Sequence, residues 1–419
     1  MPQTAHVAVI GAGIVGAATA HALLDKGVRV TLIDPARAGD AQAASYGNGA
    51  FISPASIIPM SMPGLWRNVP RYLLDPMGPL TIRWASLPRL LPWLVRFLAA
   101  GATEQRVTKT AATLWALLHD GPARHSALAA RHGLSDYIRT DGLLYAYPDR
   151  AAFTAESLAW RLRRANGLQW REVEGDALRA FEPALSPHYA FAAVVEEGAH
   201  CTDPGAYVAA LVAAAEGRGA QFVQARATGF VRGSGLQAVE TTVGPVACTH
   251  AVIAAGYQSA ALARQLGDRI PLVSERGYHV EVPHARGGPT RPVMPSEGKM
   301  ANTPLTGRLR AAGQVEIAVP TAAPNWKRAD ILLKNMQIAY PQLRFEPTEV
   351  TRWLGHRPST PDGLPVIGPA RGCVQVIHAF GHGHVGLAAA PVTAAQVAAL
   401  ITASPLPLAA QPFSPTRFR

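Results

Sequence analysis

The chain has 419 residues, of which 48% are hydrophobic and 16% are charged, a composition typical of a folded protein and not of a disordered one. Its length suggests at least two domains. The formal net charge is +11 at pH 7, but the arginines are scattered singly without a basic run or a nucleic-acid module, so we expect no nucleic-acid partner.

The N-terminal stretch "HVAVIGAGIVGAATAHALLDKGVRVTLID", residues 6–34, predicts a strand, a helix and a second strand. The apolar run 6–10 suits a buried parallel strand. A helix is expected over 14–26, with Gly27 as its left-handed stop, and the second strand over 28–33. This is the order of elements in a dinucleotide-binding unit.

Glycines at 11, 13 and 16 form the pattern G-x-G-x-x-G inside this unit. The first permits a tight turn, the second lets a pyrophosphate approach the backbone, and the third lets the helix pack on the strand. Asp34 ends the second strand where a ribose-hydroxyl acceptor is expected, and an acid there favours NAD or FAD over NADP. The alternative is a tight turn that binds no ligand.

The alternation of strand and helix then stops at "AASYGNGAFISPASIIPMSMPG", residues 43–64, which is rich in Ser, Gly, Asn and Pro. A nicotinamide domain would continue with further strands and helices. The interruption therefore favours FAD, in a domain assembled from separate pieces of chain.

The middle of the chain predicts a second domain. A helix is expected over 86–100, where apolar residues with Arg89 and Arg96 suit a membrane-surface helix, a core helix or an interface under a lid; Pro88 and Pro92 limit its regularity. Alternating runs at 137–147, 276–282 and 313–319 are typical of antiparallel strands. Within 276–282, Tyr278 and His279 must face opposite sides, and we expect Tyr278 to face the substrate, with a core or surface position as the alternative.

Two later segments look like further parts of the first, dinucleotide-binding domain. Asp203 and Pro204 predict the start of a helix that ends near 217–219. A buried strand over 251–255 then ends at Gly256, where small residues would let a ligand lie against the backbone; a plain buried strand is the alternative.

The C-terminal part contains the remaining candidates. "GHGHVG", residues 381–386, precedes an alanine-rich helix, and glycines at a helix start expose N–H groups that suit negative charge. His382 and His384 lack a third ligand nearby, so we expect no metal site. Arg357, in "GHRPSTPDGLPVIGP", could bind a carboxylate through two parallel bonds or could pair with Asp362 as a structural arginine.

These segments together resemble the D-amino-acid oxidase-like flavoprotein superfamily. The chain looks most like the bacterial D-amino-acid dehydrogenases and D-hydroxyproline dehydrogenases. The similarity spans nearly the whole chain and includes "VIGAGIVG", "SYGNGAFISP", "VIAAG", "ERGYHVEV", "HRPSTPDGLPVIG", "GHGHVGLAAAP" and "PFSPTRF".

The resemblance implies an α/β fold with a Rossmann-like FAD-binding domain built from discontinuous segments and an α+β substrate domain with an antiparallel sheet. We expect the FAD-binding domain over 1–58, 196–270 and 351–419, and the substrate domain over 59–195 and 271–350. The residues implied to bind FAD are Gly11, Gly13, Ile14, Val15, Gly16, Asp34, Ser45, Asn48, Gly49, Thr228, Ala255, Gly256, Gly383, Val385, Gly386 and Leu387.

The resemblance also assigns catalytic roles. Arg357 would hold the substrate carboxylate while the α-hydrogen leaves as hydride to flavin N5. Glycine oxidase-like relatives carry an arginine where this chain has His384, so we expect another role there, toward a substrate hydroxyl or the imine. The cysteine placement of covalently flavinylated relatives is missing, so we expect non-covalent FAD.

The expected function is dehydrogenation of D-amino acids, including cyclic imino acids such as D-proline or 4-hydroxy-D-proline, with a quinone or another non-oxygen acceptor. The alternatives are a glycine or sarcosine oxidase that uses oxygen, a flavoprotein subunit of a larger electron-transfer complex, and a non-enzymatic NAD-binding module.

Cysteine usage and the first strand bear on the compartment. Cys201, Cys248 and Cys373 are widely spaced without a CxxC pair, which favours a reducing compartment and no zinc or iron–sulfur site. The strand expected near His6 leaves no room for a signal peptide, and no apolar run reaches transmembrane length. We expect a cytoplasmic protein, and the basic charge leaves open a peripheral contact at the inner face of the membrane.

Overall fold

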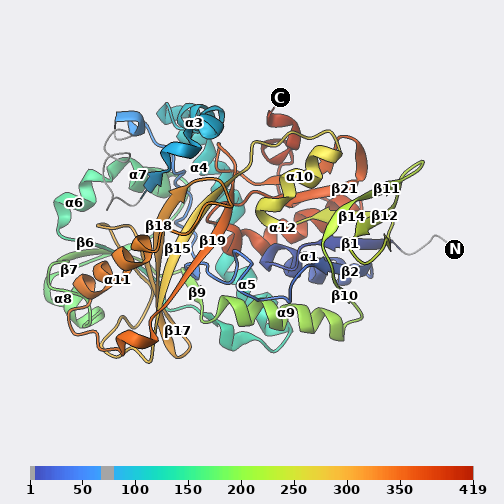
Figure 1. Ribbon diagram of the computed structural model, residues 1–419. Coiled ribbons are helices and arrows are strands. Elements are labelled where there is room, and N and C mark those ends of the chain that lie inside the picture. Colours follow the sequence, from blue (N-terminus) through green and yellow to red (C-terminus); the bar gives the residue numbers. More distant parts are fainter. Residues whose placement is uncertain (1–4, 68–79, 419) are drawn as a thin grey trace.

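The computed structural model describes residues 5–67 and 80–418. Its strands form two larger sheets and two small ones, with helices packed on their faces (Figure 1). The α/β fold class expected from the sequence is confirmed, with one predominantly parallel sheet and one mixed, largely antiparallel sheet.

The first sheet has six strands in the order β10-β2-β1-β14-β21-β20, all parallel except β20, which runs antiparallel to β21. Short apolar runs form its buried centre. It therefore gathers strands from distant parts of the chain. Its strands are β1 (His6–Ile10), β2 (Arg29–Asp34), β10 (Gln221–Gln224), β14 (His250–Ile253), β20 (Val366–Ala370) and β21 (Cys373–Phe380).

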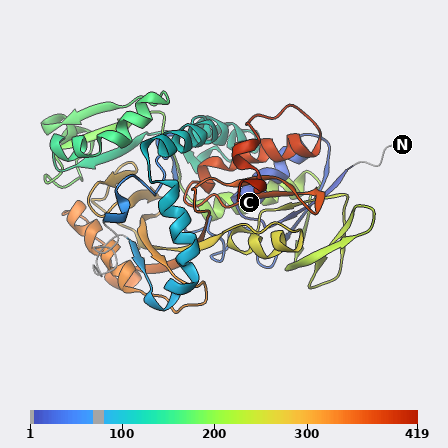
Figure 2. The same ribbon diagram turned by 90° about the horizontal axis from the view of Figure 1, so that it is seen from above.

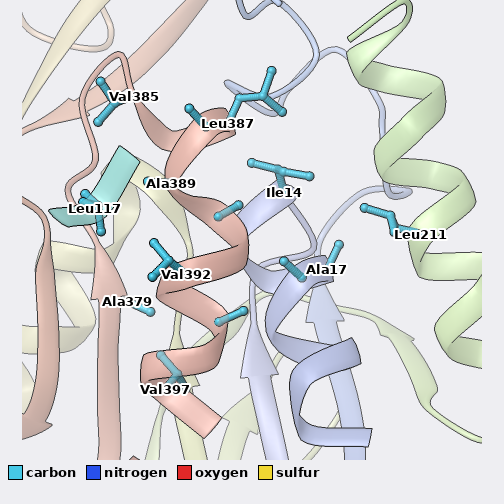
Figure 3. Packing of buried hydrophobic residues seen from close by; sticks show 14 of the residues in the cluster. Ile14, Ala17, Leu117, Leu211, Ala379, Val385, Leu387, Ala389, Val392 and Val397 are labelled. Atoms are coloured by element: carbon cyan, nitrogen blue, oxygen red, sulfur yellow. The ribbon is translucent and has the colours of Figure 1, made fainter. Parts of the chain in front are cut away.

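Helices rich in alanine pack together beside this sheet. Figure 3 shows Ala389 and Val392 of one helix lying near Ile14 and Ala17 of another, in one buried cluster. Small side chains allow the helix axes to approach closely. The helices of this region are α1 (Ile14–Leu24), α4 (Glu104–Leu118), α5 (Gly121–Arg131), α9 (Pro204–Gly217), α10 (Ser259–Gln265) and α12 (Gly386–Ile401).

The larger mixed sheet follows the order β19-β15-β18-β17-β16-β6-β8-β7, and β4 pairs with β18. The alternating runs predicted at 276–282 and 313–319 lie in its long central strands, as expected. Its strands are β4 (Leu80–Ile82), β6 (Leu143–Tyr147), β7 (Arg171–Glu174), β8 (Phe191–Val195), β15 (Val273–Pro283), β16 (Val293–Pro295), β17 (Ala301–Leu305), β18 (Arg308–Ile317) and β19 (Thr351–Ser359).

Further helices pack around this sheet, and the view from above shows the orange helix over residues 327–339 at the end of the molecule away from the N-terminus (Figure 2). They are α3 (Leu87–Ala100), α6 (Arg150–Ala155), α7 (Ser157–Ala165), α8 (Gly175–Phe181) and α11 (Lys327–Ala339). In α3, Leu90 and Trp93 are buried, whereas Leu91 and Val95 are exposed. Within the described ranges no helix is both long and apolar enough to cross a membrane.

Two three-stranded sheets complete the fold. One consists of β11 (Ala227–Arg232), β12 (Leu236–Thr241) and β13 (Val246–Ala247). The other joins β3 (Phe51–Ile52), β5 (Ile138–Arg139) and β9 (Ala199–Cys201). The second holds β3, at the end of the loop that follows β2, against a later segment of the chain, which fixes where that loop ends.

The predicted helix ends are close to the observed ones. Helix α1 ends at Leu24, two residues before the predicted end, and Gly27 has the left-handed φ of +71° that was expected. Asp203 caps α9 by accepting a hydrogen bond from Ala206 N at 3.0 Å. Strand β14 ends at Ile253, so Ala254 and Ala255 belong to the turn and not to the strand.

Candidate active site

The glycine motif forms a tight turn between β1 and α1. Gly11 has φ +108°, and a Cβ on it would lie 2.4 Å from Ala254 O, so only glycine fits between the two strands. A Cβ on Gly16 would lie 1.9 Å from Gly11 O, which explains the close packing of α1 on this turn. The N-terminus of α1, where backbone N–H groups are free of intrahelical partners, therefore points toward the space above the turn.

Asp34 closes one side of this turn. Its Oδ2 accepts a hydrogen bond from Ala12 N at 2.8 Å and its Oδ1 accepts one from Ala36 N at 3.1 Å. Burial raises the pKa of the carboxyl, while these hydrogen bonds and the charge of Arg226 oppose the rise. The carboxylate is thus fixed at the end of β2 with lone pairs left for a further donor.

The loop 45–49 lies over the start of α1. Ser45 Oγ accepts a hydrogen bond from Ile14 N at 3.0 Å, which places a hydroxyl at the helix N-terminus. A Cβ on Gly13 would lie 3.3 Å from this Ser45 Oγ, so the passage between turn and loop is narrow. Both features suit a phosphate group between the loop and the helix.

Side chains from the mixed sheet hold this loop by its carbonyl groups. The buried Arg310 of β18 donates from Nη1 to Tyr46 O at 2.8 Å and to Asn48 O at 2.6 Å. Thr303 of β17 donates to Gly49 O at 2.7 Å. The loop that contacts the glycine turn is therefore positioned by the other sheet.

A large cavity of about 1120 Å³ begins at the glycine turn and reaches the mixed sheet. Fifteen of the sixteen residues predicted to bind the cofactor line it; the sixteenth, Gly16, lies beneath Gly11 and acts through packing. The lining residues are Gly11, Gly13, Ile14, Val15, Asp34, Ser45, Asn48, Gly49, Thr228, Ala255, Gly256, Gly383, Val385, Gly386 and Leu387. A cavity with a glycine turn, a fixed acid and a helix N-terminus at one end fits FAD.

The segment 381–386 forms the wall where α12 begins. Gly381 and Gly383 have φ values of +85° and +54°, conformations that favour glycine, and Gly383 N donates to Pro358 O at 2.9 Å. His382 is buried and its Nε2 pairs with Thr393 Oγ1 at 3.0 Å, so this ring nitrogen is already engaged by α12. Among the described residues no group of three or more His, Cys, Asp or Glu side chains is arranged to hold a metal ion.

Arg357 reaches the same cavity from β19. Its register partner on β15 is Glu275, and its guanidinium lies over Gly277, where a Cβ would be 2.9 Å from Arg357 Cζ. Among the described residues the guanidinium has no hydrogen-bond or ion-pair partner. Burial lowers its pKa and the Glu275 carboxyl opposes this, and a guanidinium stays charged at neutral pH, so Arg357 brings a positive charge to the cavity lining.

The alternative for Arg357, a structural pair with Asp362, does not occur. Asp362 accepts instead from Arg417 Nε at 2.7 Å.

His384 lines the same cavity as Arg357. Its side chain is exposed on the cavity side of the loop. Burial and the positive charge of Arg357 lower the pKa of His384 to about 4. Its ring is therefore neutral at pH 7, with one donor and one acceptor nitrogen.

Tyr278 does not reach the cavity. Its side chain is 1% exposed and packs on the α11 side of the mixed sheet. Its hydroxyl donates to Glu316 Oε2 at 2.8 Å and accepts from Asn325 N at 2.9 Å. The neighbouring position, Gly277, faces the cavity instead, so the expected orientation of Tyr278 is corrected to the core alternative.

The structure adds Trp353, which sequence analysis did not identify. Its indole lines the cavity, stacks on His279 with ring centroids 4.9 Å apart, and donates to Ala41 O at 2.8 Å. A Cβ on Gly47 or Gly355 would come within 2.1 Å of the ring. The two glycines were the available signal, but they are far apart in the sequence.

Comparisons with known proteins agree with this geometry. A family model described as "FAD dependent oxidoreductase" (DAO) matches residues 6–400. A Bradyrhizobium diazoefficiens protein named D-amino-acid oxidase is 48% identical over the full length of both chains. A Ralstonia nicotianae protein named D-amino acid dehydrogenase 2 is 30% identical, covering 98% of this chain and all of the relative.

Solved structures share the fold. Glycine oxidase from Geobacillus kaustophilus has a TM-score of 0.73 at 22% identity, covering 99% of each chain. L-Proline dehydrogenase from P. horikoshii has a TM-score of 0.74 at 19% identity, covering 100% of this chain and 98% of that one. With the cavity and its lining, the sequence similarity places this chain in the DAO family: it is an FAD-dependent oxidoreductase.

Proposed function

We propose that this protein oxidises D-amino acids and that Arg357 binds the substrate carboxylate. The observation that carries the proposal is a charged guanidinium, without an ion-pair partner among the described residues, facing a cavity that fits FAD at its other end. A planar guanidinium can bind a carboxylate through two parallel, charge-assisted hydrogen bonds. The preference for the D form is drawn from the names of the relatives.

When bound, FAD supplies an acceptor for the hydride that leaves the substrate α-carbon. The chain's own residues orient the substrate for this transfer. Arg357 fixes the carboxylate, and the neutral His384 beside it can accept a hydrogen bond from the amino group or from a substrate hydroxyl. Apolar residues such as Phe97 and Val315 line the same cavity and limit water around the substrate.

Cyclic imino acids such as D-proline or 4-hydroxy-D-proline are proposed substrates, since His384 offers a partner for a ring nitrogen or hydroxyl. The relative with 48% identity is named an oxidase, which favours oxygen as the acceptor over the non-oxygen acceptor expected from the sequence. Relatives at 28–33% identity are named dehydrogenases, so a quinone or another acceptor is the second candidate.

We propose non-covalent FAD and a cytoplasmic location. The cysteines at 201, 248 and 373 are buried and none of them lines the cavity. Acid denaturation should therefore release the flavin from the chain. Contact with a membrane surface stays a proposal that rests on the exposed Leu91 and Val95 of α3 and on the basic net charge.

Substitution of Arg357 tests the proposed carboxylate contact. In the Arg357→Leu variant, anaerobic flavin reduction by D-amino acids should fall about 30- to 1000-fold, because the contact is worth about 2–4 kcal/mol. Arg357→Lys should recover part of the loss, since lysine keeps the charge but not the paired geometry.

Arg352→Leu is the matched control. Arg352 lies on the same strand and pairs with Asp330 at the surface, at 2.8 Å. The flavin of the Arg352→Leu variant should be reduced by D-amino acids at the wild-type rate. Equal rates of flavin reduction in the wild type and in Arg357→Leu would show that Arg357 does not bind the substrate carboxylate.

A further inference from the structure

A second, much smaller cavity lies behind His384. Its volume is about 30 Å³, and His384 lines both this cavity and the large one. Gly381, Gly383 and Val385 also belong to both linings. The loop before α12 is thus a thin wall with the substrate cavity on one side and the small cavity on the other.

Three polar atoms of the residues that line the small cavity have no hydrogen-bond partner within the described part of the chain. They are Ser61 Oγ, Glu275 Oε2 and Ser359 Oγ. The exposed fractions of these residues are 3%, 3% and 4%, so bulk water does not reach them. Leaving a buried polar group unsatisfied is costly, and buried polar atoms in native proteins are almost always paired with protein or with ordered water.

The size and chemistry of the cavity fit ordered water. A buried water needs roughly 10–15 Å³ of such space and two to four polar partners. A cavity of about 30 Å³ with a carboxylate oxygen and two hydroxyls meets both conditions for one or two water molecules.

Few charged groups surround the Glu275 carboxyl. Arg357 faces it from β19, His384 from the loop before α12, and Asp362 from the turn after β19, where it is already paired with Arg417. The residues of α3, α4 and β18 that face it are uncharged: Phe97, Ala100, Thr110, Leu114 and Ile317.

Glu275 is therefore a buried carboxyl that faces one arginine, Arg357, from the neighbouring strand. Burial raises its pKa, and the positive charge of Arg357 partly opposes this rise. The Ser359 hydroxyl lies close enough to oppose it as well, although its geometry does not meet that of a hydrogen bond to Glu275. A carboxyl less acidic than usual is better suited to accept a proton near neutral pH.

We propose that Ser61, Glu275 and Ser359 hold a buried water site through which Glu275 takes up a proton from the substrate cavity by way of His384. The inference rests on the proposed function. An amino acid that arrives with an ammonium group must lose one proton before its α-hydrogen can leave with the electron pair. In this step an N–H bond of the ammonium breaks and an O–H bond forms on Glu275, with no change in oxidation state.

His384 can pass the proton because a neutral imidazole accepts on one nitrogen while it donates from the other. The water between His384 and Glu275 completes the transfer in the same way. Glu275 touches neither the substrate nor the flavin, so it acts as a positioning and proton-holding residue.

The test compares wild type with Glu275→Gln, a variant of the same shape. Flavin reduction by a D-amino acid is followed anaerobically from neutral to alkaline pH in the FAD-loaded protein. At neutral pH the wild-type protein should react faster than the variant, because only the wild type has a carboxylate at position 275 that can take up the ammonium proton. The variant should be about 100-fold slower at pH 7 and should approach the wild-type rate at alkaline pH, where the free amine binds.

Ser359→Ala should also slow flavin reduction near neutral pH, but by a smaller factor than Glu275→Gln. The control is Glu316→Gln, because Glu316 is buried in an ion pair with Arg276 at 2.8 Å and lines neither cavity. This control should keep the wild-type pH profile even if it loses stability.

A crystal structure of the holoenzyme gives a readout independent of turnover. Density for water bonded to Ser61, Glu275 and Ser359 is expected, and an empty small cavity would overturn the inference. Normal reduction with the same pH profile in Glu275→Gln would overturn the proton route alone. Wild-type flavin that no D-amino acid reduces would overturn the proposed function, and the proton route with it.

Discussion

The guanidinium of Arg357 lies directly over the backbone of Gly277 on the neighbouring strand. A Cβ at position 277 would be 2.9 Å from both Cζ and Nε of Arg357. Gly277 pairs with Gly355 in the strand register, so the arginine leans along the sheet over a surface without side chains. This relationship makes a glycine on β15 a determinant of where the carboxylate would bind.

The first prediction follows from this contact. Gly277→Ala should displace the Arg357 guanidinium and raise the KM for amino acids at least about 10-fold, because a contact below 3 Å cannot be kept and a charge-assisted contact would be weakened. Steady-state kinetics measure the effect on substrate binding, and the bound FAD content measures any effect on cofactor binding. The FAD content should not change.

Gly217→Ala serves as the control, since a Cβ there meets nothing within 4 Å at the end of α9. An unchanged KM in Gly277→Ala would show that Arg357 does not depend on this surface.

The second prediction concerns the loop that covers the start of α1. Thr303→Val removes the donor to Gly49 O and leaves that carbonyl without this partner. The loss should cost about 1–2 kcal/mol and weaken FAD binding about 5- to 30-fold, as measured by equilibrium dialysis of flavin from the protein.

Thr108→Val is the matched control. Thr108 donates to Glu104 O on the exposed side of α4, at 2.8 Å. FAD binding as tight in Thr303→Val as in Thr108→Val would contradict the role of the mixed sheet in holding the loop.

The third prediction concerns acid stability. Five buried histidines have pKa values lowered by burial, to about 3 for His279 and about 4 for the others: His21, His125, His200 and His382. Between pH 6.5 and 4 the unfolded chain binds protons at these sites and the native chain does not. Stability should therefore fall as the pH falls through this window, by up to about 1.4 kcal/mol per pH unit for each histidine.

Glu182 and Glu275, whose pKa values burial raises, oppose part of this loss at the acid end. Urea unfolding at pH 7.0 and 5.5 measures the slope. His125 is the site to test, because its ring pairs with Leu387 O at 2.7 Å. His125→Asn should lower stability at pH 7 and flatten the slope, and a slope identical to that of wild type would contradict the account.

Local signals in the sequence were sufficient for the cofactor end of the cavity. The turn at Gly11, the acid at Asp34 and the cap at Asp203 each depend on residues within one short segment, so spacing alone predicts them. The position of Arg357 in the cavity depended on the resemblance to a family, because β15 and β19 meet only through the register of distant strands.

Two features lay beyond such signals. Alternation shows that Tyr278 and Gly277 face opposite sides, but β15 is buried on both faces, so burial could not say which side holds the cavity. Trp353 occupies space left by Gly47 and Gly355, and only the folded chain brings Gly47 to this ring.

The central claim is tested most directly by anaerobic mixing of the purified protein with D and L forms of proline, 4-hydroxyproline and alanine, and with glycine, followed by air. The account predicts rapid loss of the oxidised flavin's visible band with D forms, slow or no loss with L forms, and quick recovery in air if oxygen is the acceptor. Slow recovery would assign a different acceptor and keep the substrate class. Bleaching by L forms or by glycine alone, or by none of these compounds, would contradict the account.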